Sequence, residues 1–312
     1  MKFRVAQLVC ISSLYVLAFG ATAARGGVGG VAPPPQQQER TSVAVLDLGG
    51  TDAGQRAADE LASALGKAPG FDLVNRSQAR AAARGIGYGG SLNLTLQEAR
   101  DLGAAIGCDF YFTGEAQTLR RTSTSRADYF ESYASVFLVS AETGRLVLWE
   151  HFNAEAATPG EAEKHLLAEL RVRASRYAEP ISKARDAERR ERQLAREREA
   201  SAFEDVPEEG SPAAAGFRAP QPYRSLRPAY PDTAARAAAE ATVDALVEVD
   251  AAGEVKDIEI VRWAGYGLNE AVISTVRRLH FRPAMRDGQA IPIRVLLRYN
   301  FRRPAEENKG QE

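Results

Sequence analysis

The sequence predicts a mixed protein with two folded regions, an α/β region followed by a smaller α+β region. Short apolar runs alternate with helical stretches between residues 41 and 179, and a strongly charged segment follows at 180–221. Residues 222–303 then hold two strand-like runs, a helix and a final alternating strand. The 312 residues suffice for two domains of ordinary size plus linkers. We therefore expect an N-terminal domain with a mixed sheet and a C-terminal strand–strand–helix–strand unit.

The overall composition does not indicate a strongly charged or strongly apolar interaction surface. The formal net charge is -1 and aromatic residues make up 8% of the chain. A nucleic-acid-binding or membrane-coating protein usually carries a marked charge excess. We therefore expect no nucleic-acid partner.

The N-terminus has the pattern of an export signal. Lys2 and Arg4 precede an apolar run, Val5–Phe19, and the small residues Ala21–Ala23 follow it. A membrane-spanning helix needs roughly 20 apolar residues, and this run is shorter. We expect a signal peptide over residues 1–24, with an uncleaved inner-membrane anchor as the alternative.

The first folded region begins after a stretch at 25–40 that is rich in Gly, Pro and Gln and is expected to be a flexible tether. Thr95–Glu98 has the form of a capping box, which starts a helix, and Gly107 is placed to end it. Glu142–Gly144 forms the turn of an expected hairpin. The expected strands are Val43–Leu48, Phe71–Val74, Phe110–Phe112, Tyr133–Ser140 and Arg145–Phe152, and the first helix includes Gln55–Leu65.

Four short motifs of this region carry a family likeness. They are Val43–Asp47, Leu73–Arg76, Gly107–Gly114 and the turn Thr143–Gly144. Through them, residues 41–160 resemble the CsgG, LpoB and TolB N-terminal group of envelope domains. The resemblance implies an accessory or assembly role rather than a reaction.

The segment 180–221 is expected to link the two regions. Acid-before-base pairs four residues apart between Asp186 and Arg192 favour a solvent-exposed helix, and Pro180 separates it from the helical stretch 161–178. Such a helix would hold the two domains apart. Residues 203–222, with Pro, Gly, Ala and acids, are expected to be disordered.

The C-terminal region alternates clearly. Thr242–Asp250 and Val255–Arg262 form two strands around a short turn, and apolar residues from Leu268 to Leu279 lie on one helical stripe. In the last run, Ile291–Phe301, apolar residues face one way, while arginines face the other.

Three motifs give this region its likeness, namely Arg227–Pro231, Phe281–Ala284 and Ile291–Phe301. Together they resemble the C-terminal domain of the TonB family, periplasmic modules that touch outer-membrane transporters. The resemblance covers residues 222–303 and implies that the final strand adds an extended segment of the transporter as an extra strand. Residues 304–312 are then a tail.

The candidate partner-binding residues follow from that resemblance and from the open edge of a last strand. They are Tyr230, Pro231, Arg294, Leu296 and Arg298. Two structural alternatives stay open. The arginines can serve only to keep an exposed strand soluble, and Tyr230 can pack under the sheet while Pro231 starts a helix.

The chain departs from an energy-transducing TonB, which has a membrane helix with a histidine near its N-terminus. Here the histidines are His151, His165 and His280, and a folded domain replaces the long proline-rich spacer. We expect a periplasmic TonB-like protein that binds envelope partners, outer-membrane transporters among them. The alternative is an adaptor or scaffold for envelope or cell-wall assembly without energy coupling. The partner's identity and the oligomeric state stay open.

Several motifs suggest enzymes but lack their required context. Asp47–Thr51 copies the phosphate-binding opening of actin-like sugar kinases, yet a helix follows it and no second phosphate motif appears. Gly85–Gly90 follows a helical run rather than the strand that a dinucleotide fingerprint needs. The histidines lack zinc-site spacing, and Cys108 is expected to be a buried free thiol. We expect no catalysis, no metal and no cofactor.

Overall fold

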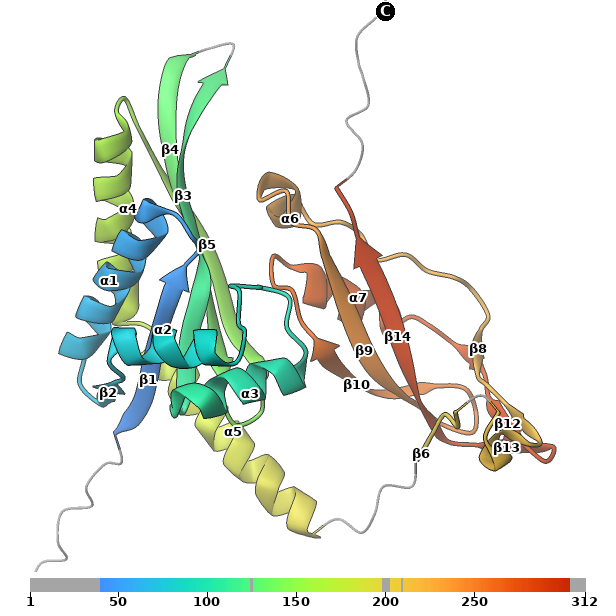
Figure 1. Ribbon diagram of the computed structural model, residues 1–312. Helices are drawn as coiled ribbons and strands as arrows, with labels where there is room; N and C mark the ends of the chain where they lie inside the picture. Colours follow the sequence, from blue (N-terminus) through green and yellow to red (C-terminus); the bar gives the residue numbers. More distant parts are fainter. Residues whose placement is uncertain (1–39, 124–125, 198–202, 209, 304–312) are drawn as a thin grey trace, which may run out of the picture. The chain divides into compact units, whose positions relative to one another are not determined.

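The computed structural model describes residues 40–123, 126–197, 203–208 and 210–303, which form a mixed α/β protein with several sheets (Figure 1). The expected signal peptide, nearly all of the tether and the tail at 304–312 lie outside the described residues. Within the described part, no helix combines the length and the apolar character that crossing a membrane requires.

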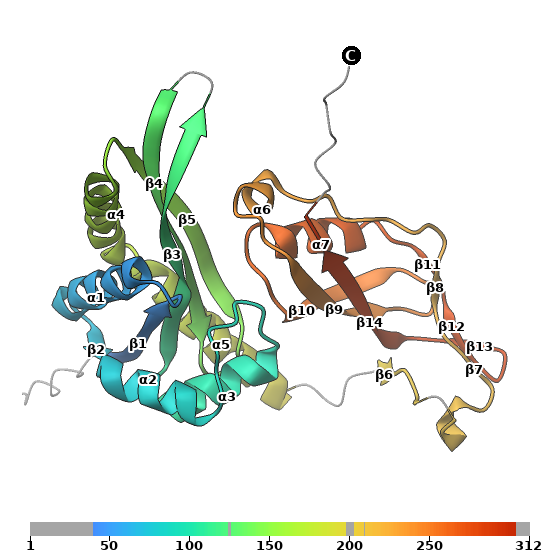
Figure 2. The same ribbon diagram turned by 45° about the horizontal axis from the view of Figure 1, so that its top comes forward.

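A five-stranded sheet dominates the N-terminal part, and its strand directions are mixed, as predicted. β1 pairs in parallel with β2 and β3, while β3, β4 and β5 form an antiparallel meander. The pairing of β3 with β4 continues well past Gly114, where β1 ends, and β5 accompanies β4 as far as Phe130, so these three strands extend well beyond β1 (Figure 2). In spatial order the strands are β2 (Phe71–Leu73), β1 (Thr41–Leu48), β3 (Phe110–Ser123), β4 (Arg126–Ser140) and β5 (Leu146–Ala156).

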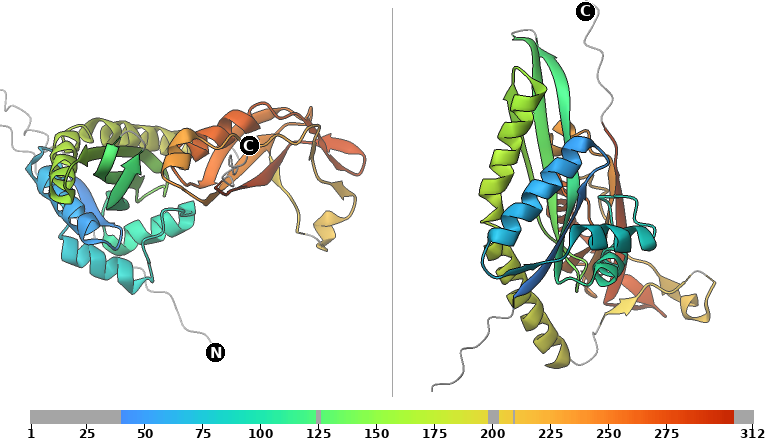
Figure 3. Two further views of the ribbon diagram at one scale, coloured as in Figure 1. Left: turned by 90° about the horizontal axis from the view of Figure 1, so that it is seen from above. Right: turned by 60° about the vertical axis from the view of Figure 1, so that its left-hand side comes forward.

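Helices cover both faces of this sheet, because alternate residues of β1 are buried on opposite sides. Val43 and Val45 of β1 pack with α1, α4 and the start of α5, whereas Ala44 and Leu46 pack with α2 and α3. Figure 3 shows α1 and α4 side by side on the first face. The helices are α1 (Asp52–Lys67), α2 (Arg76–Gly85), α3 (Leu96–Ile106), α4 (Pro159–Ala174) and α5 (Ala178–Glu197).

Local capping signals place the ends of these helices. Thr51 accepts a hydrogen bond from the Gly54 amide at the start of α1. The predicted capping box is present at Thr95 and Glu98, and α3 ends at Gly107 in the left-handed conformation (φ 76°). Both predictions for α3 are therefore confirmed.

The charged helix α5 differs from the free spacer expected of it. It begins at Ala178, and Ile181 in its first turns is buried in the core beneath α4. Farther along, Arg185 donates to the Thr41 hydroxyl (2.7 Å) and Glu191 accepts from Arg145 (2.6 Å). The helix therefore lies against the sheet, because distant strand residues supply partners for its charges.

A second sheet forms the C-terminal part and confirms the strand–strand–helix–strand order. β9 and β14 pair antiparallel over nine residues, from Ala241↔Phe301 to Val249↔Ile293. Helix α7 packs on the face that buries alternate valines of β9. The elements are β9 (Ala241–Val249), β10 (Val255–Arg262), α7 (Leu268–Val276) and β14 (Ile293–Phe301), with the sheet order β10-β9-β14-β6.

The segment 203–222 also differs from expectation, because its described residues form short strands rather than a disordered stretch. Glu204 at its start forms an ion pair with Arg286 (3.0 Å), and the Arg286 guanidinium lies over the Phe217 ring. These partners lie far from the segment in sequence, so its composition alone does not predict that its short strands pair with them. The strands are β6 (Glu204–Asp205) on β14, β7 (Phe217–Arg218) on β12 (Ala284–Arg286), and β8 (Gln221–Pro222) on β11 (Phe281–Arg282). The remaining elements are η1 (Pro212–Ala214), α6 (Asp232–Arg236) and β13 (Gln289–Ile291).

The loop after β10 joins the two sheets through one continuous core. Trp263 is 1% exposed, donates its indole N–H to the Gly144 carbonyl (3.0 Å), and stacks on Phe137 with ring centroids 6.0 Å apart. Tyr266 donates its hydroxyl to Glu115 (2.7 Å). Asn93 adds side-chain hydrogen bonds to the carbonyls of Trp263 and of Thr242, each 2.8 Å long. The sheets are therefore packed together, and α5 does not hold them apart as expected.

Candidate partner-binding edge

One side of β14 is open along most of its length. β9 pairs with the whole strand on one side, whereas β6 pairs on the other side only with Ile293 and Arg294. From Val295 to Phe301, no strand in the described part of the chain pairs with this second side. An unpaired strand edge presents N–H and C=O groups that an added strand can satisfy.

The strand carrying this edge is firmly held at both ends. Ile293 is fully buried and Phe301 is 7% exposed, and both lie on the face that packs toward α7 and the core. Strict alternation places Leu296 on the opposite face, where it is 51% exposed. The predicted apolar inner face of β14 is therefore confirmed, and the outer face carries the predicted arginines together with Leu296.

The two candidate arginines of β14 are engaged by acids on β9. Arg298 donates to both carboxylate oxygens of Asp244, at 2.7 and 2.9 Å, and Arg294 donates to Glu248 at 3.1 Å. Asp244 is 3% exposed and also lies 3.4 Å from Arg262 of β10. The hydrogen bond from Arg298, followed by its charge and that of Arg262, lowers the pKa of Asp244. These contacts tie three strands together on the outer face.

Sequence reasoning missed the acids of this network. Alternation along β9 places Asp244 and Glu248 on the outward face, but it does not give their register against β14. The pairs Arg298↔Asp244 and Arg294↔Glu248 follow from the antiparallel register of β14 with β9. An acidic residue directly opposite each arginine on the neighbouring strand is the signal that would have identified Asp244 and Glu248.

The other two candidates, Tyr230 and Pro231, lie at the end of β14 rather than along its edge. The Tyr230 hydroxyl donates to the Ala239 carbonyl (2.8 Å), and its ring lies 6.4 Å from that of Phe301. Pro231 caps the start of α6. The structure thus brings Arg294, Leu296 and Arg298 together on one face and separates them from Tyr230 and Pro231.

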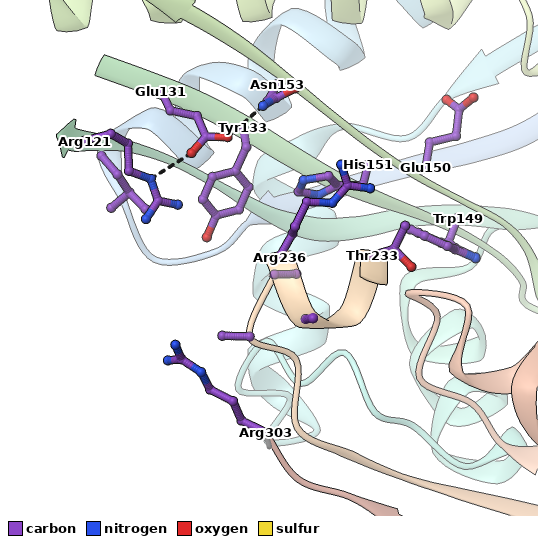
Figure 4. A pocket seen from close by; sticks show the side chains of 14 residues that line it. Arg121, Glu131, Tyr133, Trp149, Glu150, His151, Asn153, Thr233, Arg236 and Arg303 are labelled. Carbon is purple, nitrogen blue, oxygen red and sulfur yellow. Dashed lines mark hydrogen bonds and ion pairs between the residues drawn. The ribbon is translucent and has the colours of Figure 1, made fainter. Parts of the chain in front are cut away.

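A polar cavity of about 450 Å³ lies between strands β3–β5 and helix α6 (Figure 4). Arg236 reaches from α6 toward His151, whose Nδ1 lies 2.9 Å from the Ser135 hydroxyl. Burial lowers the pKa of His151, although Glu115 and Glu131 act against this. Ser135 is fully buried, so its hydroxyl is out of reach of a substrate. The Ser–His contact is therefore structural and does not form a catalytic dyad.

The described residues contain no group of three His, Cys, Asp or Glu side chains placed to hold a metal ion. Cys108 is a half-buried free thiol whose pKa is raised to about 12, first by burial and then by the charge of Asp109. A thiol with such a pKa stays protonated and is a poor nucleophile near neutral pH.

Residues 227–302 match the family described as Gram-negative bacterial TonB protein C-terminal. The C-terminal unit is therefore a TonB-type domain, and this family is of a binding rather than an enzymatic kind. None of the curated proteins compared with the chain matches it significantly. The resemblance of residues 41–160 to the CsgG, LpoB and TolB group stays a prediction.

Two solved structures resemble parts of the chain. The solution structure of the Pseudomonas aeruginosa TonB C-terminal domain is 18% identical, with a TM-score of 0.24, and the match covers 35% of this chain and 100% of that one. The hypothetical protein CT253 from Chlamydia trachomatis is 12% identical, with a TM-score of 0.32, and the match covers 44% of this chain and 96% of that one.

Proposed function

We propose that this chain is a periplasmic TonB-like protein that recognises an extended segment of an envelope partner by adding it as a strand to β14. An outer-membrane transporter is the proposed partner. The observation that carries this proposal is the open side of β14 from Val295 to Phe301, in a unit that matches the TonB C-terminal family.

Backbone hydrogen bonds would supply most of the affinity in such a complex, and side chains would supply the selection. Leu296 is the exposed apolar side chain on the open strand and is proposed to contact the partner directly. Arg294 and Arg298 already pair with Glu248 and Asp244, so their proposed role is to hold the outer face of the sheet. An acidic partner would have to compete with those β9 carboxylates.

Tyr230 and Pro231 have a proposed positioning role. Tyr230 lies beside Phe301, the last residue of β14, and its hydroxyl fixes the turn that follows α6. Pro231 starts α6, and its ring lies close to Gly267. Both residues therefore support the end of the strand on which a partner segment would lie.

Short strand β6 limits how a partner segment can add. It pairs with Ile293 and Arg294 in parallel, at the start of β14. An added strand has seven further residues, Val295–Phe301, before it meets β6. A longer segment would have to displace β6, whose side-chain anchors include the ion pair of Glu204 with Arg286.

The experiment is photocrosslinking in cells from a photoreactive amino acid placed at Leu296. Val172 on α4 is the matched control, since it is 55% exposed and lies on a helix that packs in a different core cluster from β14. Mass spectrometry of the adducts then identifies the partner and its crosslinked segment. A further variant, Leu296→Asp, places a charge on the proposed contact without disturbing a buried position.

The expected result is an adduct between position 296 and the periplasmic plug of an outer-membrane transporter, absent from position 172. Leu296→Asp should weaken the association of that transporter with the protein in pull-downs. Adducts only to assembly or cell-wall proteins would reject the transport role and leave the adaptor function. Equal adducts from both positions would reject recognition by β14.

Export is tested separately, by sequencing the N-terminus of protein released by osmotic shock. A mature chain that starts near residue 25 supports the periplasmic proposal. An intact N-terminus retained in the inner membrane would instead support an anchored protein.

A further inference from the structure

Two glycine-rich loops that are far apart in sequence line one cavity of about 350 Å³ on the α2 side of the large sheet. One is Asp47–Gly50, directly after β1, and the other is Gly85–Gly90, at the end of α2. Taken alone, the first loop lacks the context of a sugar-kinase phosphate loop, and the second lacks the context of a dinucleotide fingerprint. The structure brings both to the same place.

The cavity lies where the direction of the fold reverses. The chain leaves β1 through α1 to reach β2 on one side, then returns through α2 and α3 to β3 on the other side. β1, β2 and β3 are parallel, and the loop after β1 stands at the carboxyl end of the middle strand of these three. In open α/β sheets, ligands bind in the crevice at such a switch point.

Arginines of α2 surround the cavity with one positive charge in excess. Asp47 accepts hydrogen bonds from Arg76 (2.6 Å) and Arg80 (3.2 Å), and Arg76 also pairs with Asp59. Arg84, one turn after Arg80, is exposed and has no ion pair in the described part of the chain. The Nε of Arg80 is buried and, among the described residues, has no hydrogen-bond partner. Of these groups, the guanidinium groups of Arg80 and Arg84 and the carboxylate of Asp47 line the cavity, which leaves one positive charge in excess.

The loops add backbone donors to these charges. The amide groups of Gly50, Gly89 and Gly90 donate no hydrogen bond to another backbone group in the described residues. A Cβ atom added at any of the three positions would meet no atom within 4 Å, so open space lies above the backbone. Bare amides beside guanidinium groups suit an anion with several acceptor oxygens, and phosphate fits this pattern better than a carboxylate.

We propose that this cavity binds a phosphate-bearing small molecule, with its phosphate against Arg84 and the amides of Gly50 and Gly89. Asp47 is held by Arg76 and Arg80, and the proposal is for binding alone, without transfer of a phosphoryl group. The proposal is independent of the partner-binding edge on β14.

Isothermal titration calorimetry of the purified protein tests this site with inorganic phosphate, pyrophosphate and glucose 6-phosphate. Glucose and acetate serve as the neutral and carboxylate comparators. The variants are Arg84→Ala, which removes the free guanidinium, and Gly89→Asp, which places a carboxylate in the cavity. Gly89 does not have a positive φ, so an L-residue is tolerated there. Arg224→Ala, an exposed arginine outside the cavity, is the charge-matched control.

The expected result is saturable binding of at least one phosphate probe, with weaker or no binding of glucose and acetate. Arg84→Ala should weaken that binding about tenfold, as for the loss of one charge-assisted hydrogen bond, and Gly89→Asp should abolish it. Arg224→Ala should bind like the parent protein. No saturable binding of any phosphate probe, equal binding of acetate, or equal losses in Arg84→Ala and Arg224→Ala would overturn the proposal.

Discussion

Replacing Trp263 with alanine should remove the main contact that joins the two sheets. The indole is 1% exposed, stacks on Phe137, and donates a hydrogen bond to the Gly144 carbonyl at 3.0 Å. The substitution leaves a large cavity at this junction and a buried carbonyl without its donor. We therefore expect damage to the coupling between the sheets as well as to the core.

The size of the effect follows from these contacts. Truncating a buried Phe or Trp to alanine costs about 3–5 kcal/mol, which is a large part of a typical total stability of about 5–15 kcal/mol. Trp263→Phe keeps most of the ring and loses the hydrogen bond, so its cost should be smaller, about 1–3 kcal/mol. The two variants therefore separate packing from hydrogen bonding.

Urea denaturation followed by circular dichroism measures both costs by linear extrapolation. The chain has two tryptophans, Trp149 and Trp263, so Trp149→Phe leaves Trp263 as the only indole. In that variant, Trp263 fluorescence should resist quenching by acrylamide until the protein unfolds. Because one core joins the sheets, the parent protein should also unfold in a single transition.

Three results would refute this reasoning. The first is a loss below about 1 kcal/mol for Trp263→Ala, since that is far below the cost of emptying a buried indole site. The second is ready quenching of Trp263 in the native protein. The third is a pair of separate unfolding transitions, which would mean that the two sheets are stable independently.

Four further substitutions test single residues. Gly103→Ala should destabilise the protein by about 1–3 kcal/mol, because the added Cβ would lie 2.4 Å from that of Ala141. Gly66→Ala in α1 should instead stabilise the protein by about 0.5–1 kcal/mol, because alanine favours the helix more than glycine does. Urea midpoints measure both changes. Arg298→Ala should lower the urea midpoint near pH 7. Arg298 lowers the pKa of Asp244 in the folded protein, so this carboxylate is protonated first in the unfolded chain as the pH falls below about 3.9. The difference in urea midpoint between the variant and the parent should therefore close below that pH. Burial lowers the pKa of His151, and the charge of Arg236 acts in the same direction, while the charges of Glu115 and Glu131 oppose this. Neutral His151 therefore contributes its full stabilisation above about pH 6.5, and this contribution declines as the pH falls. His151→Gln should flatten the fall in melting temperature between about pH 7 and pH 5, and an unchanged slope would contradict this role.

Local signals in the sequence predict local structure well. The capping box at Thr95, the helix end at Gly107 and the alternation along β14 depend on residues within a few positions of one another. These signals are enough to place α3 and to assign the inner and outer faces of the final strand. The alternation alone therefore puts Leu296 on the exposed face.

Contacts between distant segments are the part that the sequence conceals. Ile181 is one of few large apolar residues in a charged helix, and composition alone does not show that it docks under α4. Trp263 follows a strand without belonging to a periodic pattern, yet it joins the two sheets. The pairing of Arg298 with Asp244 likewise requires the register of two strands, in which these residues are 54 positions apart.

The most direct test of strand addition is hydrogen exchange of the β14 amides with and without the partner segment captured by crosslinking from position 296. We predict that amides between Val295 and Phe301 on the open side exchange quickly in the free protein and become protected in the complex, while β10 is unchanged. Protection confined to β10, β5 or the helices, with β14 exchanging as before, would contradict recognition through this edge.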